Sequence, residues 1–507
     1  MDPKVIAAAR TAFPATANSI TLGAVVHGGA CDPEPLVSLP LAMINRHGLI
    51  AGATGTGKTK TLQLIAEQLS NAGVPVFLAD VKGDVSGIAA AGDSNERIAQ
   101  RAKDTGYAWR GMASPVEFLS LSGKRGAQLR ATVSSFGPLL LAKILGLNDT
   151  QTSVLTLVFK YCDDKGLLLL DFADLRAVLQ YLSDNAAELK DYGAISKQSV
   201  SVLLRQMVTL EMAGAAQFFG EPEFDLNDLI QFERDGRGLV SVLELSDVQD
   251  KPVLFSTFML WMLATLYNHL PEVGDADKPK LVFFFDEAHL LFKDASKALL
   301  DEVEKVVRLI RSKGVGIFFV TQNPRDVPQT VLGQLGHKVQ HALRAFTPDD
   351  EAAMKSAART FPKTDFYDVQ ETLTSLGIGE ALVTVLSPKG VPTPPFATRL
   401  IPPATRMAPL SDAELAQRCN TPQVHKYAQA IDRESAREML AARAVGTLAA
   451  TPAATATKPA AGNSGETSAW DSFVNSRVVK QVSYQVTRQV TSSITRGLMN
   501  ALIKSIK

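Results

Sequence analysis

Gly52-Ala53-Thr54-Gly55-Thr56-Gly57-Lys58-Thr59 is the stretch that decides the fold of this 507-residue chain. It fits the phosphate-loop pattern G-x-x-x-x-G-K-[ST] in full, between the apolar HGLIAG run and a helix-like run over 59–73. The glycines let successive N–H groups face phosphate oxygens, and the helix N-terminus adds partial positive charge. Lys58 would bridge the β- and γ-phosphates, and the Thr59 hydroxyl would ligate Mg²⁺.

The sequence therefore predicts ATP and Mg²⁺ as cofactors, with a chance glycine turn as the minor alternative. The predicted nucleotide-binding residues are Gly52, Ala53, Thr54, Gly55, Thr56, Gly57, Lys58, Thr59 and Thr61.

Two later apolar runs end in polar residues that suit hydrolysis. In LVFFFDE, 281–287, Asp286 would hold the magnesium through water and Glu287 would act as general base. In FFVTQNP, 318–324, Gln322 would bond the γ-phosphate or the attacking water, unless it is a strand-end amide that caps a loop. His289 either couples nucleotide to substrate or serves as a helix cap or packing residue. The glutamate favours hydrolysis over phosphoryl transfer to a small acceptor.

The order strand, loop, helix, strand around the phosphate loop is a βαβ unit, which requires a parallel sheet with helices on its faces. Buried strands are expected within 74–80, 238–245, 281–287 and 315–321, and later strands within 376–386 and 392–403. The predicted segments are N-terminal strands or a cap (1–45), the first part of the core (46–136), a helical insertion (137–222), the second part of the core (223–405), a helical extension (406–444), a flexible linker (445–468) and a basic amphipathic C-terminal helix (469–507).

Asp80 and four arginines leave alternatives open. Asp80 ends the run 74–80 and joins either a water-positioning network or the metal ligands, or else it is a turn acid before Lys82-Gly83-Asp84. Arg46, Arg308, Arg311 and Arg344 lie near strand ends, where an arginine can reach a nucleotide across a subunit boundary. The residues alone do not choose among them.

Composition and charge exclude several classes of protein. With 52 Lys+Arg against 52 Asp+Glu and 46% hydrophobic residues, the chain is neither disordered throughout nor a globally basic nucleic-acid binder. Cys31, Cys162 and Cys419 lack metal-like spacing, which favours a reducing cytoplasm. The N-terminus shows no signal-peptide pattern. The apolar run 253–267 is shorter than the roughly 20 residues of a membrane span, so we expect a buried helix and no transmembrane segment.

Four strings in fixed order resemble a known family. GATGTGKTKT (52–61), FFFDEAHLLF (283–292), RSKGVGIFFVTQNP (311–324) and HKVQHALRAFTPDD (337–350) are similar to the HerA-like branch of the HerA/FtsK ATPases, and most to the bacterial YjgR group of HerA-like helicases. The resemblance implies a RecA-like α/β core in a hexameric ring that translocates on double-stranded DNA.

The resemblance also implies roles for single residues. Lys58 and Thr59 match the phosphate-loop pair, and Asp286 and Glu287 match the magnesium and base acids. The other matches are Asp80 with an acid after the second core strand, Gln322 with a sensor glutamine, Arg311 with an arginine finger, and Arg46 with a second arginine that acts across the subunit interface.

One departure from the family bears on the partners. HerA proteins place a β-barrel ahead of the core, and only 51 residues precede the phosphate loop here, so docking to a nuclease partner is not expected through a barrel. A DNA-translocating ring needs basic loops, for which Lys124, Arg125 and Arg130 are candidates. The alternative function is an ATP-dependent oligomeric switch or scaffold that acts on protein partners without moving DNA.

The C-terminal stretch carries apolar residues at every fourth position from Val478 to Ile506. This period predicts one slowly drifting stripe on a basic helix, although 482–486 also alternates like a strand. Such a helix would bind an anionic membrane surface, DNA or its own ring. We favour docking on the ring, because the stripe needs burial and no Trp/Phe cluster accompanies it.

Overall fold

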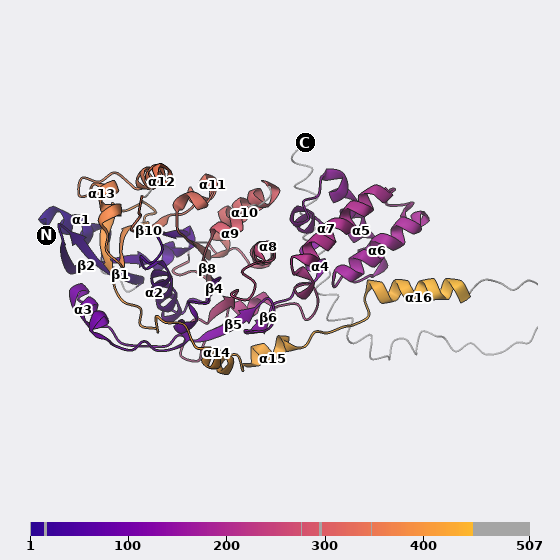
Figure 1. Cartoon of the computed structure of the whole chain (residues 1–507), viewed down its shortest axis with the longest axis horizontal. Helices are drawn as coiled ribbons and strands as arrows, with labels where there is room; N and C mark the ends of the chain where they lie inside the picture. The colour runs from indigo at the N-terminus through magenta and orange to yellow at the C-terminus, as the bar shows by residue number, and fades with distance from the viewer. Residues whose placement is uncertain (1, 15–17, 275, 294–296, 346, 450–507) are drawn as a thin grey trace, which may run out of the picture. The chain divides into compact units, whose positions relative to one another are not determined.

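A single twelve-stranded sheet organises the protein, and its strands from β10 to β6 are parallel. The computed structural model describes residues 2–14, 18–274, 276–293, 297–345 and 347–449 (Figure 1). The strand order is β2 (Ala30–Pro40), β1 (Ser19–His27), β12 (Phe396–Leu400), β11 (Glu380–Thr384), β10 (His337–His341), β3 (Gly48–Ala51), β9 (Val315–Thr321), β8 (Leu281–Phe285), β4 (Val76–Asp80), β7 (Val240–Glu244), β5 (Val116–Ser120) and β6 (Ala127–Gln128).

Two hydrophobic cores cover the two faces of this sheet. Alternate residues of a strand enter opposite cores, so that in β8 Phe283 and Phe285 face one core and Val282 and Phe284 face the other. One core includes residues of α1 (Pro3–Ala12) and α2 (Lys58–Asn71). The other includes residues of α8 (Pro252–His269) and α10 (Lys297–Ile310). The central strands β3, β9, β8 and β4 are largely apolar because both faces are covered.

Four helices between β6 and β7 pack on one another and extend the second core. They are α4 (Val133–Ile144), α5 (Asp149–Lys165), α6 (Phe172–Asp184) and α7 (Lys197–Met212), and Figure 1 shows them as a magenta cluster. They lie largely in the stretch expected to be a helical insertion. The remaining helices are α3 (Glu96–Thr105), α9 (His289–Phe292), α11 (Gln329–Leu332), α12 (Pro348–Ala358), α13 (Val369–Ser375), α14 (Asp412–Arg418), α15 (Pro422–Ala428) and α16 (Ala436–Ala449).

The α/β fold and its buried parallel strands are confirmed. The strands expected within 376–386 and 392–403 are β11 and β12, which are antiparallel to their neighbours. Residues 1–45 contribute α1, which was not predicted, and the strands β1 and β2. Because β1 pairs with β12, these strands extend the main sheet rather than form a separate cap.

The apolar run 253–267 lies in α8, as predicted, and its large side chains such as Trp261 and Phe258 are fully buried. Among the described helices, none combines the length and hydropathy that crossing a membrane requires.

The C-terminal predictions are only partly covered by the structure. The linker was expected from residue 445, yet α16 continues to Ala449. The rest of the predicted linker, 450–468, and the predicted amphipathic helix, 469–507, lie outside the described residues.

Candidate nucleotide-hydrolysis site

Parallel pairing brings the predicted site residues to one edge of the sheet. Ala51 of β3 pairs with Thr321 of β9, and Phe285 of β8 pairs with Phe319 of β9. The carboxyl ends of β3, β9 and β8 therefore lie at the same level in the sheet. They are followed by the phosphate loop, by Gln322 and by the Asp286-Glu287 pair, respectively. The acid that ends β4 joins them, since Ala79 pairs with Phe285. Ligand sites of open α/β sheets lie in this position.

The phosphate loop has the conformation that its glycines permit. Gly57 adopts a left-handed φ of 115° and caps the N-terminus of α2. At Gly52, a Cβ would lie 2.5 Å from Cβ of His341, so glycine is needed there for close approach. The Lys58 ammonium donates a 3.1 Å hydrogen bond to the carbonyl of Ala53, which holds it over the loop. The Thr59 hydroxyl lies 3.4 Å from an oxygen of Asp84.

Thr61 has other partners than those predicted. Its side chain is buried, and its hydroxyl lies 2.8 Å from Nε2 of His341 and 3.2 Å from the carbonyl of Gly57. The hydroxyl of Thr61 thus joins α2 to β10, and its contact with a nucleotide stays a prediction. Sequence reasoning placed no function on His341, which lies far away in the chain.

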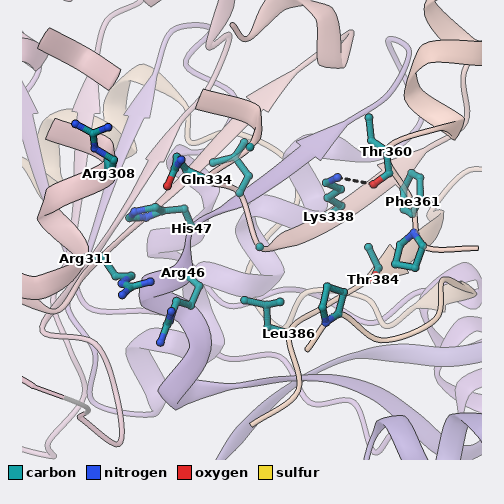
Figure 2. Close-up of a pocket in the computed structure, with 15 residues that line it drawn as sticks. Arg46, His47, Arg308, Arg311, Gln334, Lys338, Thr360, Phe361, Thr384 and Leu386 are labelled. Atoms are coloured by element: carbon teal, nitrogen blue, oxygen red, sulfur yellow. Dashed lines mark hydrogen bonds between the residues drawn. The ribbon is translucent and has the colours of Figure 1, made fainter. Parts of the chain in front are cut away.

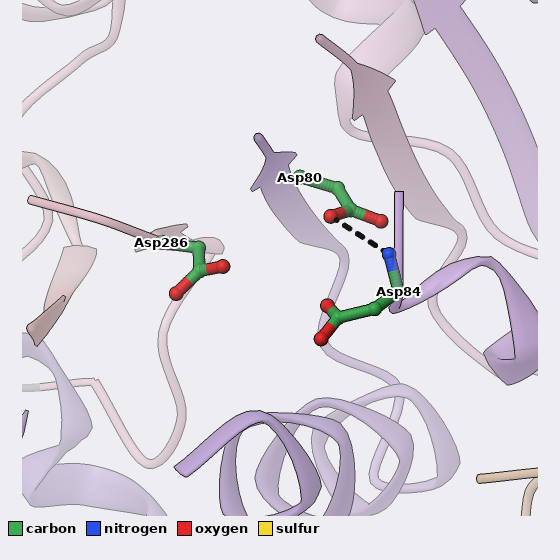
Figure 3. A group of neighbouring side chains, drawn as sticks. All are labelled: Asp80, Asp84 and Asp286. Atoms are coloured by element: carbon green, nitrogen blue, oxygen red, sulfur yellow. Dashed lines mark hydrogen bonds between the residues drawn. The ribbon is translucent and has the colours of Figure 1, made fainter. Parts of the chain in front are cut away.

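Three carboxylates converge beside the first turn of α2, as Figure 3 shows. One oxygen from each of Asp80, Asp84 and Asp286 lies within 4.8 Å of the others. Asp286 is 4% exposed, and its Oδ2 has no hydrogen-bond partner within the described part of the chain. Oδ1 of Asp84 is also unpartnered there. Buried carboxylate oxygens without donors, next to a threonine hydroxyl, fit the oxygen ligands that Mg²⁺ prefers.

The pKa of Asp286 rises to about 7, because burial disfavours the carboxylate and Glu287, Asp80 and Asp84 add like charge. A divalent cation at this place would therefore bind in competition with protons.

Asp80 builds the loop that carries Asp84. Its carboxylate accepts hydrogen bonds from the backbone N–H groups of Gly83 (2.8 Å), Asp84 (3.3 Å) and Val85 (2.9 Å). Asp80 is therefore a turn acid, and it also lies beside Asp84 and Asp286, so a role in the metal site stays a prediction. Burial raises the pKa of Asp80 to about 6. From the sequence, Asp84 was interpreted only as part of a turn. Its position four residues after Asp80, in VKGD, is the signal that could have indicated a place in the site.

Glu287 lies directly after Asp286 and is 5% exposed. It forms an ion pair with Lys82, and its Oε2 lies 3.2 Å from Nδ1 of His289. The sequence suggested that His289 either couples nucleotide to substrate or serves as a cap or packing residue. The structure shows a further feature, which is the direct contact of His289 with the predicted base. Gln322 is exposed at the end of β9, and its Oε1 lies 3.4 Å from the Thr54 hydroxyl. The glutamine thus lies beside the phosphate loop, as the strand order predicts.

Glu244 is a buried acid that the sequence analysis did not single out. It is opposite Asp80 in the register of β4 and β7 and is 1% exposed. Burial and the nearby Asp80 raise the pKa of Glu244 to about 8. This raised pKa favours the protonated, neutral form of Glu244 beside Asp80.

Three of the four candidate arginines meet at the opposite edge of the sheet, whereas Arg344 is exposed after the carboxyl end of β10. Arg46, Arg308, Arg311 and Lys338 line a cavity of about 440 Å³, shown in Figure 2, and its described lining contains no Asp or Glu. Buried His47 fixes this edge, since its Nε2 lies 2.8 Å from the carbonyl of Val307 and its Nδ1 accepts from the N–H of Ile317. Arg311 precedes β9 and Gln322 follows it, so roughly 20 Å of strand separates them. Neither Arg46 nor Arg311 can reach the phosphate loop of its own chain.

One basic residue proposed for a DNA-facing loop is wrong for that role. Arg130 is 6% exposed, and its guanidinium donates to the carbonyl of Tyr427 at 2.9 Å and to Gln128. Arg125 lies 3.3 Å from Asp412, whereas Lys124 is exposed. Arg130 therefore ties β6 to α15 inside the protein.

A family model and several known proteins match this chain. The model described as "Helicase HerA-like C-terminal" matches residues 28–507. The DNA double-strand break repair helicase HerA of Sulfolobus acidocaldarius is 20% identical over 358 residues, which cover 68% of this chain and 64% of that protein. The DNA import protein CedB of the same organism is 22% identical over 68% of this chain and 51% of its own length.

A probable helicase of Methanocaldococcus jannaschii is 26% identical over 28% of each chain. The matches to these relatives thus span less than two thirds of the relatives' own lengths.

Solved structures share the fold at low sequence identity. The conjugative coupling protein TrwB lacking its first 70 residues, solved with sulphate, superposes with a TM-score of 0.52 and 15% identity, over 80% of this chain and 93% of that one. TrwB in complex with a non-hydrolysable ATP analogue gives a TM-score of 0.51, also at 15% identity, over 80% and 94%. The protein therefore has the RecA-like fold of P-loop ATPases.

The buried acids predict a pH-dependent stability when Mg²⁺ is chelated. The pKa of Glu244 is raised in the folded protein, so its contribution is fully present below the pKa of the unfolded chain and is lost as the pH rises toward about 8. Between pH 5 and 8, the wild-type free energy of unfolding should fall relative to that of Glu244→Gln, by at most about 1.4 kcal/mol per pH unit. Urea unfolding with chelator measures this difference. The exposed-site control Glu233→Gln should follow the wild type, and parallel curves for wild type and Glu244→Gln would contradict the assignment.

Proposed function

The chain belongs to the helicase HerA-like C-terminal family, and we propose that it is an ATP-hydrolysing motor that works as a hexameric ring on double-stranded DNA. The observation that carries the hydrolysis is the meeting of the phosphate loop with Asp84, Asp286, Glu287 and Gln322 at one sheet edge. The DNA substrate is supported by the names of the relatives, two of which are described as a DNA-repair helicase and a DNA-import protein.

The residues divide the work of hydrolysis among them. Backbone N–H groups of the loop and Lys58 bind the β- and γ-phosphates, and Thr59 with Asp286 and Asp84 would hold Mg²⁺. The metal would supply charge neutralisation for the phosphates. Gln322 orients water, and Glu287 accepts its proton as the oxygen bonds to the γ-phosphorus. The bond from that phosphorus to the ADP oxygen breaks, which yields ADP and phosphate.

Lys58→Ala should lose nucleotide binding, because the variant lacks the cation held over the loop. Glu287→Gln should keep ATP bound but lower the turnover at least about 100-fold, since an amide cannot accept the proton while Asp286 remains. Fluorescent-nucleotide binding and phosphate release measure the two effects. Unchanged turnover in Glu287→Gln would contradict the assignment of the base.

The basic cavity supports assembly into a ring. It brings together Arg46 and Arg311, which lie at the sheet edge away from their own phosphate loop. Arg46, Arg308, Arg311 and Lys338 give this cavity a cationic lining, which suits an anion, and the phosphates bound by a neighbouring subunit are such an anion. In a head-to-tail ring, each subunit would offer its arginine edge to the phosphate edge of the next.

Subunit mixing tests the ring. Arg46→Ala or Arg311→Ala alone should abolish turnover. A 1:1 mixture of either variant with Glu287→Gln should regain activity, because about one quarter of random interfaces then combine an intact arginine edge with an intact base. A mixture of the two arginine variants is the matched control and should regain nothing, since every interface lacks one arginine. Equal activity of both mixtures, with subunit exchange confirmed, would exclude action across the interface.

The lack of an excess of basic residues favours a second function, which is an oligomeric switch that acts on protein partners. The net charge is zero, Arg130 is internal and Arg125 lies beside Asp412. Duplex DNA discriminates the two functions. A translocase should hydrolyse ATP faster with duplex DNA, and its DNA affinity should fall steeply between 50 and 200 mM salt, by roughly 10³-fold or more if six phosphates are contacted. ATPase activity that ignores DNA at all salt concentrations would support the switch.

A further inference from the structure

The predicted general base forms an ion pair with a lysine in this structure. The Lys82 ammonium contacts one carboxylate oxygen of Glu287, and Nδ1 of His289 lies 3.2 Å from the other. Oε2 of Glu287 has no hydrogen-bond partner among the described residues, so Lys82 is the ion-pair partner of this carboxylate. A carboxylate that is stabilised by an ammonium group is a weaker acceptor for a proton from water, so Glu287 becomes a stronger base when the Lys82 ammonium moves away.

The two partners differ in their freedom to move. The Glu287 side chain is 7% exposed, and its backbone has a φ of 47°, a left-handed conformation that is strained for a residue with a side chain. The Lys82 side chain is 48% exposed. Its backbone lies in the loop that the Asp80 carboxylate holds through Gly83, Asp84 and Val85. The ammonium of Lys82 can therefore shift on a fixed loop while Glu287 stays in place.

Lys82 also borders the space over the phosphate loop. Burial lowers the pKa of Lys58, and although Glu287 opposes this, the charge of Lys82 lowers it further, so the two ammonium groups lie close enough to repel each other. Both lysines interact with Glu287, Asp286 and Asp84. A γ-phosphate held by Lys58 would thus arrive as a new anion within reach of Lys82.

We propose that Lys82 is a second catalytic lysine: it pairs with Glu287 while the site holds no triphosphate and transfers to the γ-phosphate when ATP binds, which frees Glu287 to accept a proton. The inference rests on the proposed ATP hydrolysis. It gives the site a way to couple activation of the base to the presence of the γ-phosphate, because ADP offers no anion at that position.

Binding of ATP and ADP to the full chain tests the contact with the γ-phosphate. In the Glu287→Gln background, where ATP persists, adding Lys82→Ala should weaken ATP affinity about tenfold, as expected for loss of a charge-assisted contact, and leave ADP affinity unchanged. Unchanged ADP affinity also shows that the variant is folded. Lys82→Arg should keep part of the preference for ATP, and Lys389→Ala, at an exposed turn, is the matched control. An ATP-to-ADP affinity ratio that Lys82→Ala does not change would overturn the proposal.

Coupling between the two residues gives an independent measurement. Glu287→Gln alone should bind ATP more tightly than the wild type, because Lys82 no longer has to leave a carboxylate, and this gain should vanish when Lys82 is alanine. In turnover, Lys82→Ala should reduce kcat roughly 100-fold. Faster turnover would identify Lys82 as a simple inhibitory latch and overturn the proposal. If the wild type hydrolyses no ATP, the proposed function fails, while the affinity ratio still decides the role of Lys82.

Discussion

The site depends on the parallel register of the central strands, which places their carboxyl ends at the same level in the sheet. Parallel pairing joins the strands β3, β9, β8, β4 and β7. The residues that follow these strands therefore come to the same edge of the sheet, although they lie far apart in the sequence. The phosphate loop, Gln322, Asp286 and Asp80 each follow or end one of these strands. Apolar side chains on both faces of the sheet hold the strands in register, since a slip would break both cores.

Electrostatic imbalance gives this edge its chemistry. Asp84, Asp286 and Glu287 lie around Lys58 and Lys82, Asp80 lies beside Asp84 and Asp286, and Glu244 lies beside Asp80. Burial raises the pKa of Asp286 to about 7 and that of Glu244 to about 8, and oxygens of both acids have no hydrogen-bond partner among the described residues. In the proposed reaction, a divalent cation would balance the carboxylates, and the triphosphate would balance the lysines.

The two ends of the parallel strands carry side chains of opposite charge. One has acids and a phosphate loop, whereas the other has a cavity lined by Arg46, Arg308, Arg311 and Lys338. His47, neutral because burial lowers its pKa to about 4, ties β9 and α10 at the basic edge. Such polarity along the strands is the property that a head-to-tail assembly uses, because each subunit then completes the site of the next.

The sequence by itself determined those features of the site that lie within one short run of residues. The phosphate loop is recognisable because loop geometry, helix start and lysine lie within eight residues, and Asp286, Glu287 and Gln322 are recognisable because each follows an apolar run. Only the tertiary structure decided which distant groups meet. It brought Asp84 to Thr59, Lys82 to Glu287 and His341 to Thr61, and it placed Arg130 inside the protein. It also gathered Arg46, Arg308 and Arg311 in one cavity. The physical reason is that these contacts depend on strand order and on loops folded by buried acids such as Asp80, neither of which leaves a periodic signal in the chain.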